Sequence, residues 1–389
     1  MTDQGQAWIG PPPKPAQIAV IMLSAALAIV ITISLQPILL GGLLSEHRLT
    51  LAQVGQTASV ELLAMAIMAT IAGALFQTER LRLKAALAGI GLLAANVLTL
   101  FAADIYVMLA RALSGVCCGV YLWIVTCMLM RSHNAARYAG IITAIQAALS
   151  VGLSYLMGAL ASSQYGANAG YICLAALAAA LAAAFLLFPA RFEAIAGQQG
   201  ARVPPARGFA ALAVIFIYLA GLIGVWVYVG AFAQQSGQTP AQIGVTVSIA
   251  LAAQFVGALA ASVLGNRVNA SAAIILGAAG AFALVLAMPL QLPLPLYQAV
   301  IALFALLWMF STPFLVPMAM DVDPSRVSAL YVFTVQSVGA AAGPAICAML
   351  IQGGNVRGAI FGAGLLILAA GVLLLVVRLF WKAPASQAA

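Results

Sequence analysis

Twelve long apolar runs follow one another along the chain, and they constrain its fold more than any other feature. They lie near residues 17–41, 51–76, 84–103, 105–130, 139–161, 169–189, 208–233, 241–265, 271–290, 294–319, 327–351 and 356–381. A helix of about 20 apolar residues crosses a bilayer core of about 30 Å. Only helices or closed barrels satisfy their backbone groups in lipid, and these runs are too long for barrel strands. The sequence therefore predicts an all-α membrane protein with twelve transmembrane helices.

The composition leaves little polypeptide outside such a membrane domain. Of the 389 residues, 65% are hydrophobic and 6% are charged, and the mean hydropathy is +1.12. A soluble protein of this length needs far more polar surface. The formal net charge of +8 is spread over short loops, so we expect the lipid bilayer as a partner and no nucleic acid.

No pattern in the sequence indicates a cofactor, a metal site or an enzyme. The chain lacks a Gly-Lys-Ser/Thr phosphate loop, and His47 and His133 both lie in predicted loops. All cysteines lie in apolar runs without metal-ligand spacing, which favours packing residues over disulfides. They are Cys117, Cys118, Cys127, Cys173 and Cys347. ATP-driven pumping and hydrolytic catalysis therefore find no support.

One long polar stretch, residues 190–208, divides the runs into six plus six. We predict an N-terminal six-helix bundle over 1–189, a cytoplasmic linker over 190–208 and a C-terminal six-helix bundle over 209–389. Motifs recur between the halves at offsets of 187 to 190 residues. They are Glu79-Arg80 with Asn266-Arg267, and Arg137 and Gln146 with Arg326 and Gln336. Such a repeat indicates two pseudo-symmetric bundles, and repeats of this kind usually place a solute site at the midplane between them.

The loop charges predict the orientation. With a cytoplasmic N-terminus, one side holds thirteen basic residues and the other holds two, Arg48 and Arg357. The thirteen are Lys14, Arg80, Arg82, Lys84, Arg131, Arg137, Arg191, Arg202, Arg207, Arg267, Arg326, Arg378 and Lys382. We expect the chain in the inner (plasma) membrane of the cell. The positive-inside rule then predicts that both termini lie in the cytoplasm.

These features resemble the major facilitator superfamily over essentially the whole chain. The family's loop motif Asp-Arg-x-Gly-Arg-Arg/Lys is matched in part by residues 79–84, in which Gly and the middle Arg are replaced. Its Arg-x-x-x-Gly pattern on helix 4 is matched by Arg111 and Gly115. The resemblance implies the twelve-helix fold of this superfamily and secondary active transport by alternating access.

Two details bear on the kind of transport. Helix 5, over 139–161, lacks the Gly-Pro motif of drug/proton antiporters, and GAAAGP (339–344) falls on helix 11 instead, which weakens multidrug efflux. By the resemblance, four residues of the loop after helix 2 latch the halves in one access state. They are Glu79, Arg80, Arg82 and Lys84. Positive-inside topology alone also requires bases there, so both interpretations stay open.

Glu61 and Arg111 are the two charges that lie well inside apolar runs. Charges inside a membrane are costly and usually mark a solute or ion pathway. Glu61 lies about ten residues, or roughly 15 Å, into its helix, on one face with Gln53 and Thr57. Arg111 stays charged and needs a carboxylate, carbonyls or an anionic solute. We predict proton coupling by Glu61 and Arg111; a neutral, hydrogen-bonded acid and a structural arginine are the alternatives.

Uncharged polar and aromatic residues complete a predicted solute cavity, which the resemblance places among helices 1, 4, 7 and 10. The cavity residues are Thr32, Gln36, Ser114, Tyr121, Gln146, Tyr218, Trp226, Trp308, Thr312 and Gln336. Ser150 and Gln254 are further candidates. Tyr and Trp in membrane helices also serve as interfacial anchors or packing residues.

The sequence thus predicts a monomeric secondary active transporter whose partners are a small organic solute and protons. An organic anion is one option for the solute, because Arg111 can neutralise a carboxylate. The alternatives are a multidrug/proton antiporter and, from another class, a non-transporting membrane receptor or a membrane-embedded enzyme.

Overall fold

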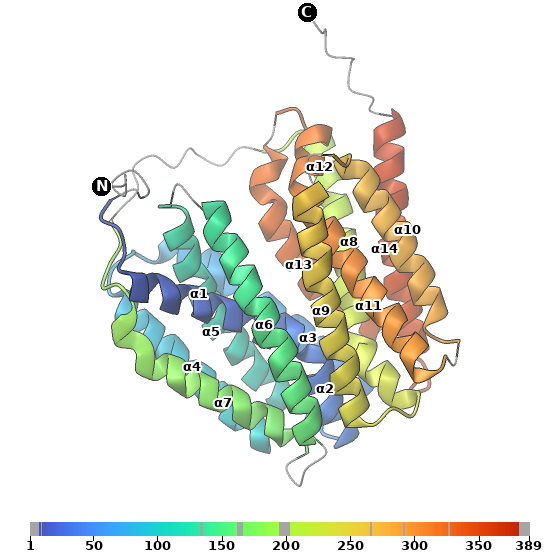
Figure 1. Ribbon diagram of the computed structural model, residues 1–389, viewed down its shortest axis with the longest axis horizontal. Coiled ribbons are helices and arrows are strands. Elements are labelled where there is room, and N and C mark those ends of the chain that lie inside the picture. The colour runs from blue at the N-terminus through green and yellow to red at the C-terminus, as the bar shows by residue number, and fades with distance from the viewer. Residues whose placement is uncertain are drawn as a thin grey trace, which may run out of the picture. The chain divides into compact units, whose positions relative to one another are not determined.

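A computed structural model describes residues 8, 10–132, 135–161, 166–193, 203–264, 267–290, 292–325 and 327–380. Regular structure in these residues is helical (Figure 1). The α-helices of the first half are α1 (Pro15–Ile29), α2 (Gln36–Ser45), α3 (Leu51–Leu75), α4 (Leu81–Phe101), α5 (Ile105–Leu129), α6 (Ala135–Ala161) and α7 (Asn168–Ala183). Those of the second half are α8 (Ala206–Gln235), α9 (Pro240–Leu264), α10 (Ala270–Ala287), α11 (Leu294–Ser311), α12 (Leu315–Val322), α13 (Val332–Ala348) and α14 (Arg357–Phe380).

The described residues hold eleven helical segments that are long and apolar enough to cross a membrane, whereas the sequence predicts twelve. The run 327–351 accounts for the difference. Its first residues form a short 3₁₀ helix, η5 (Ser328–Tyr331), and only 17 residues remain for α13. Pro344 lies inside α13 and cannot donate a backbone hydrogen bond. The twelfth span therefore stays a prediction.

The first membrane helix is interrupted. A π-helical turn, η2 (Val30–Ser34), separates α1 from α2 and includes a hydrogen bond from Leu35 N to Val30 O of 3.0 Å. Pro37 lies at the start of α2, where its missing N–H costs least. π-Turns within α-helices are frequent at functional sites. This one carries Thr32, and Gln36 follows directly after it.

Contacts divide the chain into two compact units. The N-terminal unit contains residues 1–200 and 238–245, and the C-terminal unit contains 201–237 and 246–389. The start of α9 thus belongs to the first unit. The predicted boundaries at 189 and 209 differ here, since they assign all of α9 to the C-terminal bundle. Residues 194–202 of the predicted linker and both chain ends lie outside the described residues.

In the N-terminal unit α3 packs closely on α5, because α5 presents glycines to it. A Cβ atom at Gly115 would overlap the carbonyl of Glu61, and one at Gly119 would overlap the carbonyl of Met65. Small residues spaced in this way let membrane helices approach each other closely. α4 packs on α5 and α7, and α1 packs on α5 and α6. This close packing brings the backbone of α5 next to Glu61.

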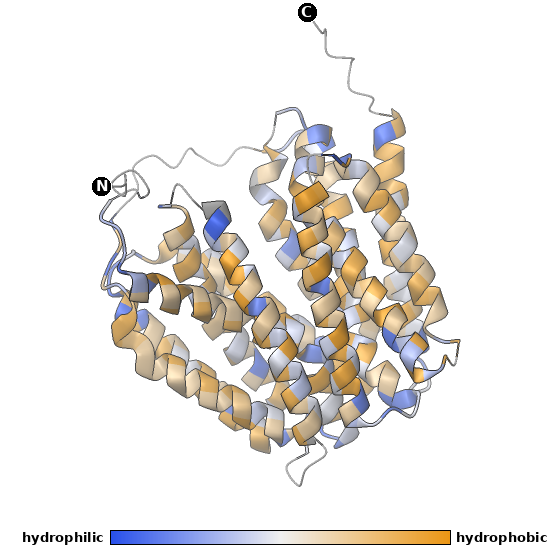
Figure 2. Cartoon of the chain, viewed as in Figure 1, coloured by the Kyte–Doolittle hydropathy of each residue, from blue (hydrophilic) through white to orange (hydrophobic). Residues whose placement is uncertain are grey.

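In the C-terminal unit α8 packs against α13 and α14. The GAAAGP segment supplies the close approach, since Cβ atoms at Gly339 and Gly343 would crowd the carbonyls of Phe216 and Ala220 on α8. Figure 2 shows hydrophobic residues along most of the helices and hydrophilic residues mainly at their ends. Exposed apolar side chains such as Leu276, which is 71% exposed, suit a lipid-facing surface.

The repeat is visible in the helix boundaries. Four helices of the second half start 189 positions after their counterparts. The pairs are Leu51 and Pro240, Leu81 and Ala270, Ile105 and Leu294, and Asn168 and Arg357. By this register the counterpart of Arg80 is Asn269, which caps α10, and not Arg267. The N-terminal ends of these helices therefore follow one common offset.

Hydrogen bonds repeat with the same offset. Thr50 N donates to Gln53 Oε1 over 2.8 Å, and Gln53 N donates to Thr50 Oγ1 over 3.3 Å. Thr239 and Gln242 make the same two bonds at 2.8 and 3.3 Å. These are capping boxes that satisfy free N–H groups at the starts of α3 and α9. Gln53 therefore serves the helix end, although the sequence grouped it with Glu61.

Candidate functional site

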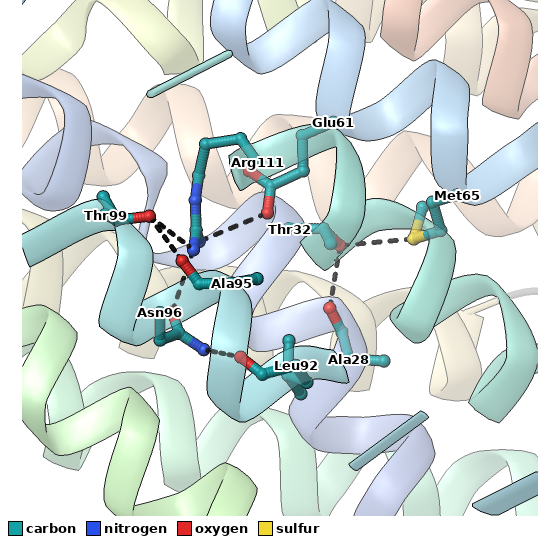
Figure 3. A network of polar contacts seen from close by, with 9 residues as sticks. All are labelled: Ala28, Thr32, Glu61, Met65, Leu92, Ala95, Asn96, Thr99 and Arg111. Carbon is teal, nitrogen blue, oxygen red and sulfur yellow. Dashed lines mark hydrogen bonds and ion pairs between the residues drawn. The ribbon is translucent and has the colours of Figure 1, made fainter. Parts of the chain in front are cut away.

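Glu61 and Arg111 meet inside the N-terminal unit (Figure 3). Arg111 Nη1 lies 3.5 Å from Glu61 Oε1, and the two side chains are 1% and 2% exposed, respectively. Charged hydrogen bonds of this kind are usually about 2.7–2.9 Å long. The pair is thus an ion pair without a tight hydrogen bond. Gly115, one turn after Arg111, permits the approach of the two helices.

The other end of the Arg111 guanidinium is fixed by α4. Nη2 donates to Asn96 Oδ1 over 3.1 Å and to Thr99 Oγ1 over 3.0 Å. Asn96 donates its amide to Leu92 O over 2.8 Å, and Thr99 donates its hydroxyl to Ala95 O over 2.7 Å. Both oxygens are therefore free to accept from Arg111, as Figure 3 shows.

Tyr171 of α7 completes the surroundings of Arg111. The guanidinium carbon lies 5.1 Å from the centre of the tyrosine ring, within cation–π range. Sequence reasoning did not find Asn96, Thr99 or Tyr171. A signal was present, because Asn96 and Thr99 are the polar residues in the interior of the run 84–103 and lie on one helix face.

Several buried polar atoms near Glu61 have no hydrogen-bond partner in the described part of the chain. They are both amide atoms of Gln36, the hydroxyls of Thr57 and Ser114, Glu61 Oε1, and Nε and Nη1 of Arg111. Gln36 and Ser114 lie next to the Glu61 carboxyl but make no hydrogen bond to it. Buried polar groups nearly always have partners, so a group of unmet ones indicates a place for a polar ligand.

Thr32 also lies near this group. Its hydroxyl donates to Ala28 O over 2.8 Å and is 3.4 Å from Met65 Sδ, one turn after Glu61. Thr32 and Gln36 are both buried. The structure thus brings three of the predicted cavity residues, Thr32, Gln36 and Ser114, beside the pair of Glu61 and Arg111.

The other two predicted cavity residues of the N-terminal unit are Tyr121 and Gln146. Tyr121 donates its hydroxyl to Ala85 O over 2.9 Å, and its ring centre is 6.1 Å from that of Phe188. These contacts pack α5 on α4, and the Tyr121 hydroxyl is already used in a hydrogen bond. Gln146 is half-buried on α6. Their role in a cavity stays a prediction.

In the C-terminal unit the predicted residues form an uncharged group. Trp226 and Trp308 meet edge to face with ring centres 5.8 Å apart, and Thr312 donates to Trp308 O over 2.8 Å. Tyr218 is fully buried beside Ser311, and its hydroxyl has no hydrogen-bond partner among the described residues. Gln336 is half-buried on α13, and Gln254 Nε2 has no partner among the described residues. These contacts bring no charge to the group.

Two acids lie at the end of α12: Asp321 belongs to its last turn, and Asp323 follows directly after it. Asp321 lies 3.6 Å from Arg378 and acts as its counter-charge. Asp323 accepts hydrogen bonds from Ser325 Oγ at 2.6 Å and Ser328 N at 2.9 Å. Burial raises the pKa of the Asp323 carboxyl, but these hydrogen bonds outweigh it and leave the pKa below its usual value. Asp323 thus has a structural role as the acceptor that holds the turn before α13.

The predicted latch loop is fastened to the segment that follows α7. Arg82 Nε donates to Phe188 O over 2.9 Å, and Lys84 Nζ donates to Glu79 O over 2.9 Å. Glu79 and Arg80 are exposed, and Arg80 has a φ of 50° in the left-handed region. The backbone adds bonds between this loop and residues 188–193. Within the described residues these contacts stay inside the N-terminal unit.

A family model and a solved structure match the chain. The family model of the Major Facilitator Superfamily matches residues 19–344. No curated protein sequence matches the chain. The fold is similar to the crystal structure of a bacterial homologue of the human lysosomal transporter Spinster, in an inward-facing and unoccupied conformation. The TM-score is 0.64 at 14% identity, over 95% of this chain and 97% of that one. At this identity the likeness shows the fold alone.

Proposed function

Since the chain belongs to the Major Facilitator Superfamily, a family of multi-pass membrane transporters that are typically not enzymes, we propose that it is a proton-coupled secondary active transporter. It moves a small organic solute by alternating access. Glu61 is the proton site, and Arg111 controls its charge. The observation that carries the proposal is the buried ion pair, in which Arg111 Nη1 lies 3.5 Å from Glu61 Oε1. Both residues also have polar atoms without a hydrogen-bond partner among the described residues.

The pair suits coupling because a ligand bound to Arg111 can cancel the effect of its charge on Glu61. Burial of a carboxylate favours its neutral form, and a nearby cation favours its charged form. A ligand that engages Arg111 removes that cation's influence on Glu61, which then takes up a proton. When the ligand leaves, the guanidinium again stabilises the carboxylate, and the proton is released. A change of one pKa unit corresponds to about 1.4 kcal/mol, so small rearrangements of the pair are sufficient to load or release the proton.

An organic anion is the solute class that this arrangement favours. Arg111 Nε and Nη1 have no hydrogen-bond partner among the described residues, whereas Nη2 is held by α4. A carboxylate oxygen can accept a charge-assisted hydrogen bond from either of these N–H groups, although Nε and Nη1 lie on different edges of the guanidinium and one carboxylate does not bridge both. Gln36 and Ser114 offer further donors beside Glu61. Solute anion and proton then bind together, with no net charge added to the site.

The topology of this transporter remains a proposal as well. We propose twelve spans, bundles over 1–189 and 209–389, and a monomer in the inner membrane with both termini in the cytoplasm. The count of basic loop residues supports this orientation. Arg202, Arg326, Lys382 and both termini lie outside the described residues. We also propose that four loop residues hold the two halves in one access state: Glu79, Arg80, Arg82 and Lys84.

The experiment uses proteoliposomes. Counterflow of a panel of radiolabelled mono- and dicarboxylates first identifies a transported anion. Glu61→Gln should then abolish accumulation driven by a pH gradient and spare exchange, because exchange moves no net protons. Asp321→Asn is the matched control: it removes a carboxylate paired at 3.6 Å that is 49% exposed. Wild-type accumulation by Glu61→Gln would show that Glu61 is a structural acid.

A further inference from the structure

We propose that the Tyr171 hydroxyl relays protons between Glu61 and the end of the N-terminal unit where α7 begins. This inference rests on the proposed function and adds the route by which the proton arrives. Tyr171 lies in the first turn of α7 and is fully buried. Its hydroxyl has no hydrogen-bond partner among the described residues, although its ring lies over the Arg111 guanidinium. By the proposed topology this end faces the outside of the cell.

A second ion pair lies at this end of the unit. Arg48 Nη1 is 3.5 Å from Glu46 Oε2, and these side chains are 15% and 33% exposed. Arg48 also donates to Asn168 Oδ1 over 2.8 Å, and Asn168 is three positions before Tyr171 on α7. The start of α7 thus contacts the outer arginine through Asn168 and the buried arginine through Tyr171.

Thr99 joins the two pairs. Its backbone carbonyl accepts a hydrogen bond from Arg48 Nη2, and its hydroxyl accepts one from Arg111 Nη2 over 3.0 Å. One residue near the end of α4 therefore contacts both arginines. Thr99 thus connects a partly exposed ion pair with a buried one, and Tyr171 lies beside the buried arginine.

Among Asn96, Thr99 and Tyr171, which contact Arg111 from α4 and α7, Tyr171 is the one whose polar group makes no hydrogen bond to the described residues. The charged groups that act on its hydroxyl are Arg111 from α5, Glu61 from α3, and Glu46 and Arg48 from the loop after α2. Arginine does not release a proton in proteins. Asn96 and Thr99 already donate to backbone carbonyls of α4. A phenol both donates and accepts, and this one is not engaged.

The transfer balances without any further reactant. In the structure the Tyr171 hydroxyl makes no hydrogen bond to the described residues, so the transfer takes place in a state in which this hydroxyl reaches the Glu61 carboxylate. In that state a hydronium ion from the outer end gives one proton to the phenol oxygen while the phenol gives its own proton to the carboxylate. Hydronium becomes water, the carboxylate becomes a carboxylic acid, and tyrosine ends unchanged. Release runs through the same steps in reverse.

The repeat separates this role from a purely structural one. At the common offset of 189, Gln235 replaces Glu46 and keeps its backbone contact: Glu46 accepts from Ala167 N over 2.7 Å, and Gln235 accepts from Val356 N over 3.1 Å. Tyr171, in contrast, corresponds to Ile360. The contact that the fold needs is kept in both halves, and the hydroxyl is found where the acid and base are found.

The test follows the protonation of Glu61 by infrared absorbance of its carboxylic acid in full-length protein in proteoliposomes after an external pH jump. Glu61→Gln identifies the band. Tyr171→Phe keeps the ring over Arg111 and removes no hydrogen bond, so it should fold normally and reach the same final protonation. We expect protonation to slow by about 100-fold, in line with the loss of one positioned proton-transfer group.

Tyr297→Phe is the matched control, because Tyr297 is also buried, has a hydroxyl without a partner in the described residues, and stacks on Phe232 away from charge. It should leave the rate unchanged. A wild-type rate in Tyr171→Phe, or equal slowing in both variants, would overturn the relay. If no band is lost in Glu61→Gln, the proposed proton site itself fails, which is a separate result. A changed final protonation with an unchanged rate would assign Tyr171 to positioning of Arg111 and would also overturn the relay.

Discussion

In the N-terminal unit α3, α4, α5 and α7 surround a charged cluster, whereas the helices that start 189 positions later bury apolar side chains at the matching positions. The matched residues, all buried, are Glu61 and Ala250, Asn96 and Val285, Thr99 and Met288, Arg111 and Val300, and Tyr171 and Ile360. The same scaffold is thus built once with a polar interior and once without it.

Other features are kept in both halves. The capping boxes of α3 and α9 match bond for bond. Close helix contacts are also kept, since Gly89 lies against Ala182 and Ala278 lies against Gly371 at the same offset. What the fold requires is therefore repeated, and the charged cluster is not. Because buried charge is costly, its presence in one half alone favours a functional role.

The largest expected effect breaks the pair. Arg111→Leu leaves Glu61 buried without its cation and should destabilise the protein by about 3–5 kcal/mol. The double variant Glu61→Ala, Arg111→Val inserts the residues of the other half and should recover most of that loss, but not proton coupling. Thermal unfolding in detergent measures the first effect, and gradient-driven uptake measures the second. A double variant as unstable as Arg111→Leu would mean that the cluster is structural.

A second prediction separates packing from coupling. Gly115→Ala drives a methyl group into the Glu61 carbonyl, and Gly257→Ala does the same at the Leu306 carbonyl of α11. Each should cost about 1–3 kcal/mol in thermal unfolding. Only Gly115→Ala should also impair coupling, because it moves α5 and Arg111. Gly73→Ala, with nothing within 4 Å of the added atom, is the control. Equal loss of coupling from Gly257→Ala would contradict the comparison.

The third prediction tests what the two halves share. Thr50→Ala and Thr239→Ala each remove the side-chain acceptor of a capping box and should cost about 1 kcal/mol. The two losses should be equal within error, and exchange of solute should continue in both variants. Clearly unequal losses, measured by thermal unfolding, would show that the matching hydrogen bonds do not carry matching energy.

The smallest effect concerns the buried acid of the C-terminal unit. The Asp323 carboxylate accepts hydrogen bonds from Ser325 and Ser328, whereas Glu61 Oε1 accepts none among the described residues. The pKa of Asp323 in the folded state lies below its usual value. A lowered folded pKa stabilises the protein above the unfolded pKa, about 3.9, and this contribution is lost as the pH falls through the folded value. The stability difference between wild type and Asp323→Asn should therefore be constant above about pH 5 and shrink below about pH 4. Thermal unfolding across this pH range measures it, and a difference that grows on acidification would contradict it.

Much of the fold was predictable because it depends on local sequence. The predicted runs 51–76 and 105–130 match α3 and α5 within one residue at each end. Apolar length decides a membrane helix, since lipid leaves the backbone no other partner. The run 327–351 was predicted less well, because its start folds into a 3₁₀ turn held by Asp323, a contact between side chain and backbone that hydropathy does not reveal.

The candidate site divides in the same way. The sequence by itself identified Glu61 and Arg111, because a charge in an apolar run is visible without any contact. Only the tertiary structure decided what surrounds them: Asn96 and Thr99 on α4, Tyr171 on α7, and the glycines that bring α5 against α3. It also showed that Gln53 caps the start of α3 and that the Tyr121 hydroxyl donates to Ala85 O. Composition and hydropathy determine which groups are costly to bury. Which partners they find depends on distances between helices far apart in the sequence, and these follow from side-chain packing alone.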